Sequence, residues 1–322
     1  MNRVLVTGAS GFVGRALCRS LRERGIEFVT AARTGAPPIP GCLRQVRVDS
    51  LGGATDWSDA LSGMTSVVHL AGEAHRVRSE SPVAALARHR AVTVAGTLQL
   101  ARAAARGGVR RLVYVSTVKV FGEGCTGSDI VAYNERHAPA PQDAYAIAKW
   151  EAELGLRQVV ATTGLEVVIL RPPLVYGPGV GANFLRLMKR VAAGWPMPLR
   201  NIENRRSLIY LGNLIDALHL SLSHERAASR TFLVSDGEDV STPVLICRVA
   251  EALGVAPRLF AFPSPVLRLA AVAGLGHTLS RLTRSLVVDI GAIRHDLRWS
   301  PPFTMTQGLQ VTADWFHQSH GR

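Results

Sequence analysis

Residues 3–14 read Arg-Val-Leu-Val-Thr-Gly-Ala-Ser-Gly-Phe-Val-Gly, a strand-like run that passes through three glycines into a helix-like pattern over 12–24. Gly8 permits a tight turn, Gly11 lets the backbone approach a pyrophosphate, and Gly14 lets the helix pack closely on the strand. The helix presents its amide groups and positive end to the anion. The stretch predicts a dinucleotide-binding turn, with a purely structural turn as the alternative. Three further residues of the turn are expected to line the same site: Ser10, Phe12 and Val13.

The alternation of strand and helix patterns continues through the first 172 residues, which indicates βαβ units and a parallel sheet. Strands are expected at 3–7, 26–31, 44–48, 66–70, 110–116 and 165–171, and helices at 12–24, 82–106 and 143–162. From Pro172 onward, turns and irregular backbone separate short helices near 183–193, 212–223, 241–253 and 305–318. We expect an α/β, doubly wound parallel sheet (a Rossmann fold) over 1–172, with a return contribution from about 207–236, and a smaller C-terminal substrate lobe over 173–322.

The net charge of +13 comes almost entirely from arginine, because only three of the 37 basic residues are lysines. The arginines are scattered and aromatic residues make up only 6% of the chain, whereas a nucleic-acid binder concentrates its basic residues on one element. We therefore expect an arginine-rich surface that attracts anionic cofactors and substrates, and no nucleic-acid partner.

Cysteine spacing and apolar segments favour a cytoplasmic protein. The four cysteines lie far apart without C-x-x-C spacing, which argues for reduced thiols and against a metal site. The chain begins without a secretory signal pattern, and the apolar stretch 267–275 contains Arg268 and is too short to span a bilayer. Stable membrane insertion is therefore not expected.

The end of the second predicted strand, Val29-Thr30-Ala31-Ala32-Arg33, bears on the choice of cofactor. An acidic residue here usually binds the free 2′-hydroxyl of NAD, whereas an arginine suits the 2′-phosphate of NADP. Arg33 therefore favours NADP(H), with NAD(H) as the alternative if Arg33 is only a solvated loop residue. Asp49 is a candidate acceptor for the adenine amino group, although it also fits as a turn-forming residue before Leu-Gly-Gly.

Tyr145 and Lys149 stand four residues apart in a helical segment, so both side chains lie on one helix face. A free phenol titrates near pH 10 and is a poor base at neutrality. An ammonium about 6 Å away, at an effective dielectric constant near 20, favours the phenolate by roughly 3 kcal/mol, or about two pKa units. Ser116 and Thr117 end a predicted strand earlier in the chain, where the Thr117 hydroxyl can bind the reacting oxygen. Thr117, Tyr145 and Lys149 together predict proton exchange coupled to hydride transfer.

These motifs resemble the extended short-chain dehydrogenase/reductase family, which includes UDP-glucose 4-epimerase and sugar-nucleotide dehydratases and reductases. The resemblance spans nearly the whole chain and adds Val-Val-His-Leu-Ala-Gly at 67–72, Val-Ser-Thr-Val-Lys-Val-Phe-Gly at 115–122 and Arg-Pro-Pro-Leu-Val-Tyr-Gly-Pro-Gly at 171–179. It implies a homodimer formed through the helices at 82–106 and 143–162. It also implies cofactor contacts from Leu70, Ala71, Gly72, Ser116 and Pro172, and contacts to the substrate phosphates from Asn183 and Arg206.

Two departures from the family pattern narrow the implied reaction. Thr93 stands where the family usually has Asn, and Val118-Lys119 replaces the Asp-Glu pair with which the 4,6-dehydratases eliminate water. Dehydration is therefore not expected. The chain looks most similar to reductases that convert a UDP-2-acetamido-2,6-dideoxy-4-ketohexose to UDP-N-acetylquinovosamine or its C4 epimer for surface polysaccharides. A net reduction agrees with the use of NADPH.

Two alternatives to this reductase stay open. The first is a UDP-hexose 4-epimerase with tightly bound NAD, and the second is a non-catalytic NADP-binding sensor or scaffold. Other polar residues also have two interpretations. His69 fits a buried core histidine better than a proton shuttle. Lys119 fits a phosphate contact or a packing role equally well, and Arg281 and Arg284 fit either diphosphate contacts or, more simply, helix-surface charge.

Overall fold

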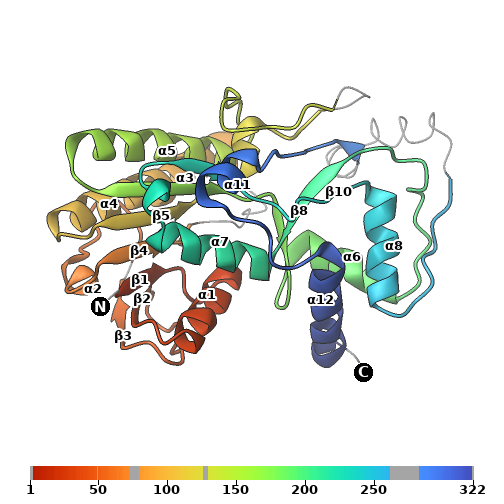
Figure 1. Cartoon of the computed structure of the whole chain (residues 1–322), viewed down its shortest axis with the longest axis horizontal. Helices are drawn as coiled ribbons and strands as arrows, with labels where there is room; N and C mark the ends of the chain where they lie inside the picture. The colour runs from red at the N-terminus through yellow and green to blue at the C-terminus, as the bar shows by residue number, and fades with distance from the viewer. Residues whose placement is uncertain (1–2, 49, 73–79, 126–129, 262–282, 321–322) are drawn as a thin grey trace.

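A seven-stranded parallel sheet forms the centre of the protein in the computed structural model, which describes residues 3–48, 50–72, 80–125, 130–261 and 283–320 (Figure 1). All neighbouring strands pair in parallel. The predicted doubly wound sheet is confirmed. The strand order is β3 (Arg44–Arg47), β2 (Phe28–Ala32), β1 (Val4–Thr7), β4 (Ser66–His69), β5 (Arg111–Val115), β6 (Glu166–Arg171) and β9 (Thr231–Leu233).

The order of the strands reverses at β1. β2 and β3 extend the sheet on one side of β1, whereas β4, β5 and β6 extend it on the other side. In open α/β sheets, ligands bind at the carboxyl ends of the strands beside such a reversal. The glycine turn follows directly after β1, so the topology places it at this position.

Helices cover both faces of the sheet because both faces are apolar. Val4 and Val6 of β1 join the core on one face, whereas Leu5 between them joins the core on the other, as the alternation of side chains along a strand requires. Helices α1 (Phe12–Glu23) and α7 (Leu211–Ser223) cover the first face, and α2 (Ser58–Leu61), α4 (Gly96–Arg106) and α5 (Ala144–Thr162) cover the second.

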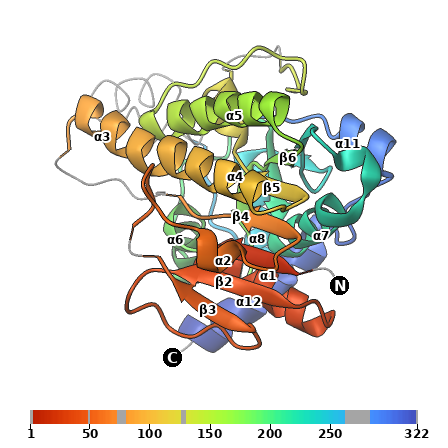
Figure 2. The ribbon, with the colours of Figure 1, turned by 90° about the vertical axis from the view of Figure 1, so that its left-hand side faces the viewer.

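The helix expected over 82–106 is a continuous helical run that contains a π-helical turn. α3 (Pro82–His89) continues into η1 (Arg90–Ala95) and then into α4, and Figure 2 shows this run lying beside α5. The hydroxyl of Ser81 accepts a hydrogen bond from the Ala84 amide at 3.2 Å and caps the first turn. π-helical turns occur frequently at functional sites, and η1 contacts α5, the helix that carries Tyr145 and Lys149.

The C-terminal half adds a smaller sheet with its own core (Figure 1). Its strands are β10 (Asp239–Val240), β8 (Arg206–Tyr210) and β7 (Leu174–Tyr176), and its helices are α6 (Ala182–Ala192), α8 (Thr242–Ala252) and α12 (Met305–His320). The short elements are η2 (Val118–Phe121), η3 (Glu225–Ala227) and α11 (Gly291–Leu297). Among the helices that the structure describes, none has the length and apolar character to cross a membrane.

The chain returns to the main sheet between β8 and β10. α7 packs beneath the sheet, and β9 pairs with β6 at its edge. Arg111, which is fully buried at the start of β5, forms an ion pair with Glu166 at 2.7 Å and donates to the carbonyls of Ser221 and His224 at 3.0 and 2.8 Å. This arginine fastens the carboxyl end of α7 to the amino ends of β5 and β6.

Candidate active site

The glycine turn forms a cradle that side chains would fill. Gly8 has a φ of +70°, and a Cβ there would lie 2.7 Å from the amide nitrogen of Ala71. A Cβ at Gly14 would lie 2.1 Å from the carbonyl oxygen of Gly8. Gly11, which precedes α1, offers no side chain to the amides of the first helical turn. The turn therefore leaves room and amide donors for a pyrophosphate, and its residues fit a dinucleotide.

A buried chain of hydrogen bonds fixes the strand end beside this turn. The hydroxyl of Thr7 accepts from the Ala71 amide at 3.2 Å and lies 2.7 Å from Nδ1 of His69, whose Nε2 lies 3.0 Å from the hydroxyl of Thr97. Burial, with a contribution from Lys149, lowers the pKa of His69 to about 3. His69 is therefore neutral and bonded on both sides, which confirms the prediction of a core histidine.

Lys149 lies at the carboxyl end of β5, next to the strand end that borders the glycine turn. Its Nζ donates to the carbonyl of Val115 at 2.8 Å and lies 4.5 Å from the centre of the Tyr114 ring. The same atom lies 6.0 Å from the centre of the Tyr145 ring, which agrees with the separation assumed from the sequence. A Cβ at Gly72 would lie 3.7 Å from this ammonium. The structure thus brings Tyr145 and Lys149 together beside the glycine turn.

Thr117 comes two residues after the carbonyl that Lys149 binds. It is 8% exposed and immediately precedes η2, which its hydroxyl caps by accepting from the Lys119 amide at 3.2 Å. Its neighbour Ser116 instead donates its hydroxyl to the buried carboxylate of Glu153 at 2.6 Å. The carbonyl of Pro172, which is also buried, accepts from the Val118 amide at 3.0 Å and holds η2 against the end of β6.

The expected lowering of the Tyr145 pKa is not found in this arrangement. Burial, with a contribution from Asp143, raises the pKa of Tyr145 to about 12. Burial also lowers the pKa of Lys149 to about 8, against the effect of Glu153. The expectation considered only the charge of Lys149 and left out the loss of solvent around both groups, and desolvation favours the neutral form of each.

Lys119 has a structural partner. Its ammonium forms an ion pair with Asp143 at 2.5 Å, and the other carboxylate oxygen of Asp143 caps α5 by accepting from the Ala146 amide at 2.8 Å. The residue that replaces an acidic family residue therefore helps to fix the first turn of the helix that carries Tyr145. This contact supports the packing interpretation of Lys119.

The residues expected at phosphates lie on different elements. Arg33 is exposed directly after β2, and Asn183 is exposed in the first turn of α6, where its side-chain oxygen accepts from Arg186. Arg206 begins β8, and its guanidinium donates to the carbonyl of Arg284 at 3.4 Å. Asp49 and Arg281 lie outside the described residues.

The structure gives Arg284 a different setting from the helix surface that the sequence suggested. Its segment bridges to Arg206 and to Cys125, and Nη1 of Arg284 donates to the carbonyl of Gly124 at 3.4 Å. Within the described ranges, Nε of Arg284 is buried without a hydrogen-bond partner. An unsatisfied, charged donor beside a second arginine suits an anionic ligand.

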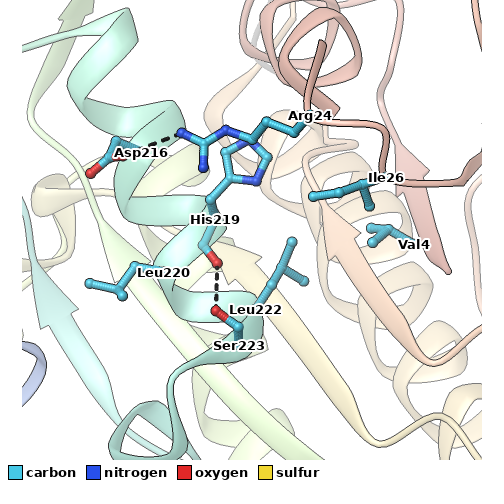
Figure 3. A pocket seen from close by; sticks show the side chains of 8 residues that line it. All are labelled: Val4, Arg24, Ile26, Asp216, His219, Leu220, Leu222 and Ser223. Carbon is cyan, nitrogen blue, oxygen red and sulfur yellow. Dashed lines mark hydrogen bonds and ion pairs between the residues drawn. The ribbon is translucent and has the colours of Figure 1, made fainter. Parts of the chain in front are cut away.

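A cavity of about 260 Å³ lies at the opposite end of the sheet (Figure 3). Arg24 at its edge forms an ion pair with Asp216 at 3.6 Å, and Nε2 of His219 lies 2.9 Å from the hydroxyl of Ser20. Burial, followed by the charge of Arg24, lowers the pKa of His219 to about 4. Val4, at the amino end of β1, also lines the cavity, so the cavity is separate from the candidate active site.

A doubly wound sheet with a glycine turn and an adjoining tyrosine–lysine pair defines the short-chain dehydrogenase/reductase type of protein. Within this class, the chain belongs to the NAD dependent epimerase/dehydratase family, whose model matches residues 4–235.

Individual relatives match over nearly their whole length. A UDP-glucose 4-epimerase of Vibrio cholerae is 38% identical, with 99% of this chain and 97% of the relative covered. The N-acetyl-alpha-D-glucosaminyl-diphospho-ditrans,octacis-undecaprenol 4-epimerase of Escherichia coli O157:H7 is 26% identical, with 98% and 95% covered. Among solved structures, MoeE5 in complex with UDP-glucuronic acid and NAD superposes with a TM-score of 0.79 at 26% identity and covers 99% of this chain and 100% of its own.

Proposed function

We propose that the protein transfers a hydride between a nicotinamide dinucleotide and C4 of a UDP-sugar. One observation carries the proposal: the glycine turn, the end of β4 and Lys149 are contiguous. Gly8 lies against Ala71. Gly72 follows Ala71 in the chain, and a Cβ at Gly72 would lie 3.7 Å from the ammonium of Lys149. A dinucleotide whose pyrophosphate binds the turn would therefore extend along 70–72 toward the tyrosine–lysine pair.

The residues of the site have distinct roles in this proposal. Tyr145 exchanges a proton with the sugar oxygen at C4, and the Thr117 hydroxyl binds the same oxygen as its charge changes. Lys149 holds a fixed position through the Val115 carbonyl and supplies positive charge to the site. When bound, the nicotinamide supplies the hydride donor or acceptor, and its oxidised form adds the positive charge that offsets the effect of burial on Tyr145.

Two arginines are proposed to hold the substrate diphosphate. Arg206 and Arg284 are joined by a hydrogen bond from guanidinium to carbonyl, and Nε of Arg284 is buried and unsatisfied within the described residues. Guanidinium groups suit phosphate oxygens because they donate several hydrogen bonds in one plane. Asn183 is proposed as a further contact from the start of α6.

Reversible 4-epimerisation is the form of the reaction that the relatives favour. The Vibrio cholerae relative is a UDP-glucose 4-epimerase, and MoeE5 binds NAD together with a UDP-sugar. An epimerase regenerates its own cofactor, so it retains NAD through the cycle. Net reduction of a UDP-2-acetamido-2,6-dideoxy-4-ketohexose with NADPH is the second candidate, and the exposed Arg33 after β2 is the observation that favours it.

One experiment separates these two reactions. The purified protein is denatured to identify any nucleotide it carries, and it is then incubated with UDP-glucose, with UDP-N-acetylglucosamine and with UDP-4-keto sugars, each with and without NADPH or NADH. Epimer formation without added cofactor, together with stoichiometric bound NAD, supports the epimerase. Loss of NADPH absorbance with a 4-keto sugar supports the reductase. If no UDP-sugar is turned over under any condition, the proposed function is wrong.

We propose a homodimer and a two-part chain as the setting of this site. The run α3–η1–α4 lies beside α5 on the outside of the sheet, and α3 exposes Val83 while α5 exposes Leu154. A second copy of the same surface would cover them. Residues 1–172 with 207–236 would bind the dinucleotide, and the rest of 173–322 would bind the sugar. Light scattering of the purified protein tests the dimer.

A further inference from the structure

A buried ion pair lies one helical turn beyond Lys149, and no step of the proposed reaction uses it. Glu153 of α5 and Arg171 of β6 are 0% and 2% exposed. Arg171 donates Nε to Oε1 of Glu153 at 3.0 Å and Nη2 to Oε2 at 2.5 Å. Ser116 donates its hydroxyl to Oε1 at 2.6 Å. One carboxylate therefore joins α5, β6 and the carboxyl end of β5.

These contacts attach α5 to two consecutive residues of the strand end. Lys149 binds the carbonyl of Val115, and Glu153 binds the hydroxyl of Ser116. Thr117 is the next residue along the chain. We propose that Glu153, held by Arg171 and Ser116, is a positioning residue that fixes Lys149 relative to Thr117 and supplies the negative charge that Lys149 faces. The inference rests on the proposed function, because it assigns a task within the same site.

Packing alone does not require charge at this position. The guanidinium of Arg171 already lies 4.9 Å from the Phe121 ring and 5.7 Å from the Trp150 ring, so the surroundings suit an apolar pair. Two charges removed from water carry a desolvation penalty that a well-packed apolar pair avoids. A carboxylate one turn from an ammonium, however, favours the charged form of that ammonium, as it does for Lys149.

Among the residues that the structure describes, five titratable or charged groups lie around Lys149 on the elements packed against it. They are His69 of β4, Tyr114 of β5, Tyr145 and Glu153 of α5, and Arg171 of β6, which reaches it through Glu153. Glu153 contributes the carboxylate of this group. Burial already lowers the pKa of Lys149 to about 8. Removing the charge of Glu153 should lower this pKa further.

The small number of lysines makes a direct test practical. The chain contains only Lys119, Lys149 and Lys189, so protein labelled with ¹³C at lysine Cε gives three signals, which Lys→Arg variants assign. The signals are titrated by NMR in the wild type and in Glu153→Gln. We expect the Lys149 midpoint to fall by about one pH unit, which is half the effect of an unpaired charge one helical turn away because Arg171 already pairs with Glu153. The other two midpoints should stay unchanged.

Glu166→Gln is the matched control. Glu166 pairs with the buried Arg111 at 2.7 Å, at the amino ends of the same two strands. This variant breaks the ion pair of another buried arginine, whose partner carboxylate is 30% exposed, and leaves the Lys149 midpoint in place if the proposal holds. A second variant, Glu153→Met with Arg171→Met, leaves no lone buried charge. Glu153, and not Arg171, acts directly on the pKa of Lys149, so this variant should still lower the Lys149 midpoint, by less than Glu153→Gln does, and it keeps the test open if Glu153→Gln does not fold.

Each outcome decides the question. An unchanged Lys149 midpoint in whichever variant folds overturns the proposal. The proposal is also overturned if both variants fail to fold while Glu166→Gln folds, because the pair of Glu153 and Arg171 is then only structural. The titration needs no substrate, so it stands even if no UDP-sugar is turned over. Where turnover is found, the alkaline limb of its pH profile should move with the lysine midpoint. Because the midpoint falls from about 8 to about 7, the rate at pH 7 should fall about twofold.

Discussion

Gly14→Ala should weaken both the fold and dinucleotide binding, and the size of the effect follows from the geometry of the turn. The added Cβ would lie 2.1 Å from the carbonyl oxygen of Gly8 and 2.7 Å from Cα of Ala9. Both obstacles are backbone atoms, so no side chain can rotate away and the turn must move by about 1 Å to restore ordinary contact distances. Such overpacking costs about 1–3 kcal/mol, which lowers Tm by about 2–4 °C in a protein of this size.

The same displacement moves the amides that face the pyrophosphate. Losing one or two charge-assisted hydrogen bonds, at about 1.5–3 kcal/mol each, weakens dinucleotide binding by at least tenfold. Differential scanning fluorimetry and fluorescence titration with NADH and NADPH measure the two effects. Gly164→Ala is the control, because a Cβ there meets nothing within 4 Å. A Gly14→Ala protein that melts and binds like the control would refute the close-packing argument.

Three further predictions follow from the site and the core. Tyr145→Phe should reduce turnover about 10²–10⁴-fold while dinucleotide affinity, measured by calorimetry, stays within about twofold; full activity would exclude Tyr145 as the acid/base. Arg33→Ala should raise KM for NADPH about tenfold without changing KM for NADH, and equal effects on both would remove its role at the 2′-phosphate. The pKa of His69 is about 3 in the folded state and near 6.5 in the unfolded state. As the pH falls below 6.5, the unfolded state therefore binds the proton first. The free energy of unfolding should decrease by up to about 4 kcal/mol as the pH drops between these two values. Urea unfolding at pH 7 and pH 5 should show a shallower fall for His69→Asn, and an identical fall would contradict this origin.

Regular patterns along the chain predicted the sheet and the position of the glycine turn. Six of the seven strands of the main sheet lie where the sequence pattern indicates. For the inner strands the reason is that a strand buried on both faces must be apolar throughout, whereas β3 at the edge is only partly buried. The sequence pattern predicted no residue range for β9, because the three residues of this strand carry too short a pattern to distinguish from a loop. The four-residue spacing of Tyr145 and Lys149 predicted their separation because a helix fixes the distance between such neighbours.

Charge state and long-range pairing depended on the tertiary structure. Burial, which the sequence does not show, raises the pKa of Tyr145 and lowers that of Lys149, so the sequence argument gave the wrong direction for the tyrosine. The contact of Glu153 with Ser116 joins residues 37 positions apart, and Arg206 meets Arg284 across 78 positions. Local periodicity thus determined the secondary structure and the catalytic spacing, whereas desolvation and contacts between distant segments, which exist only after folding, decided the electrostatics of the site.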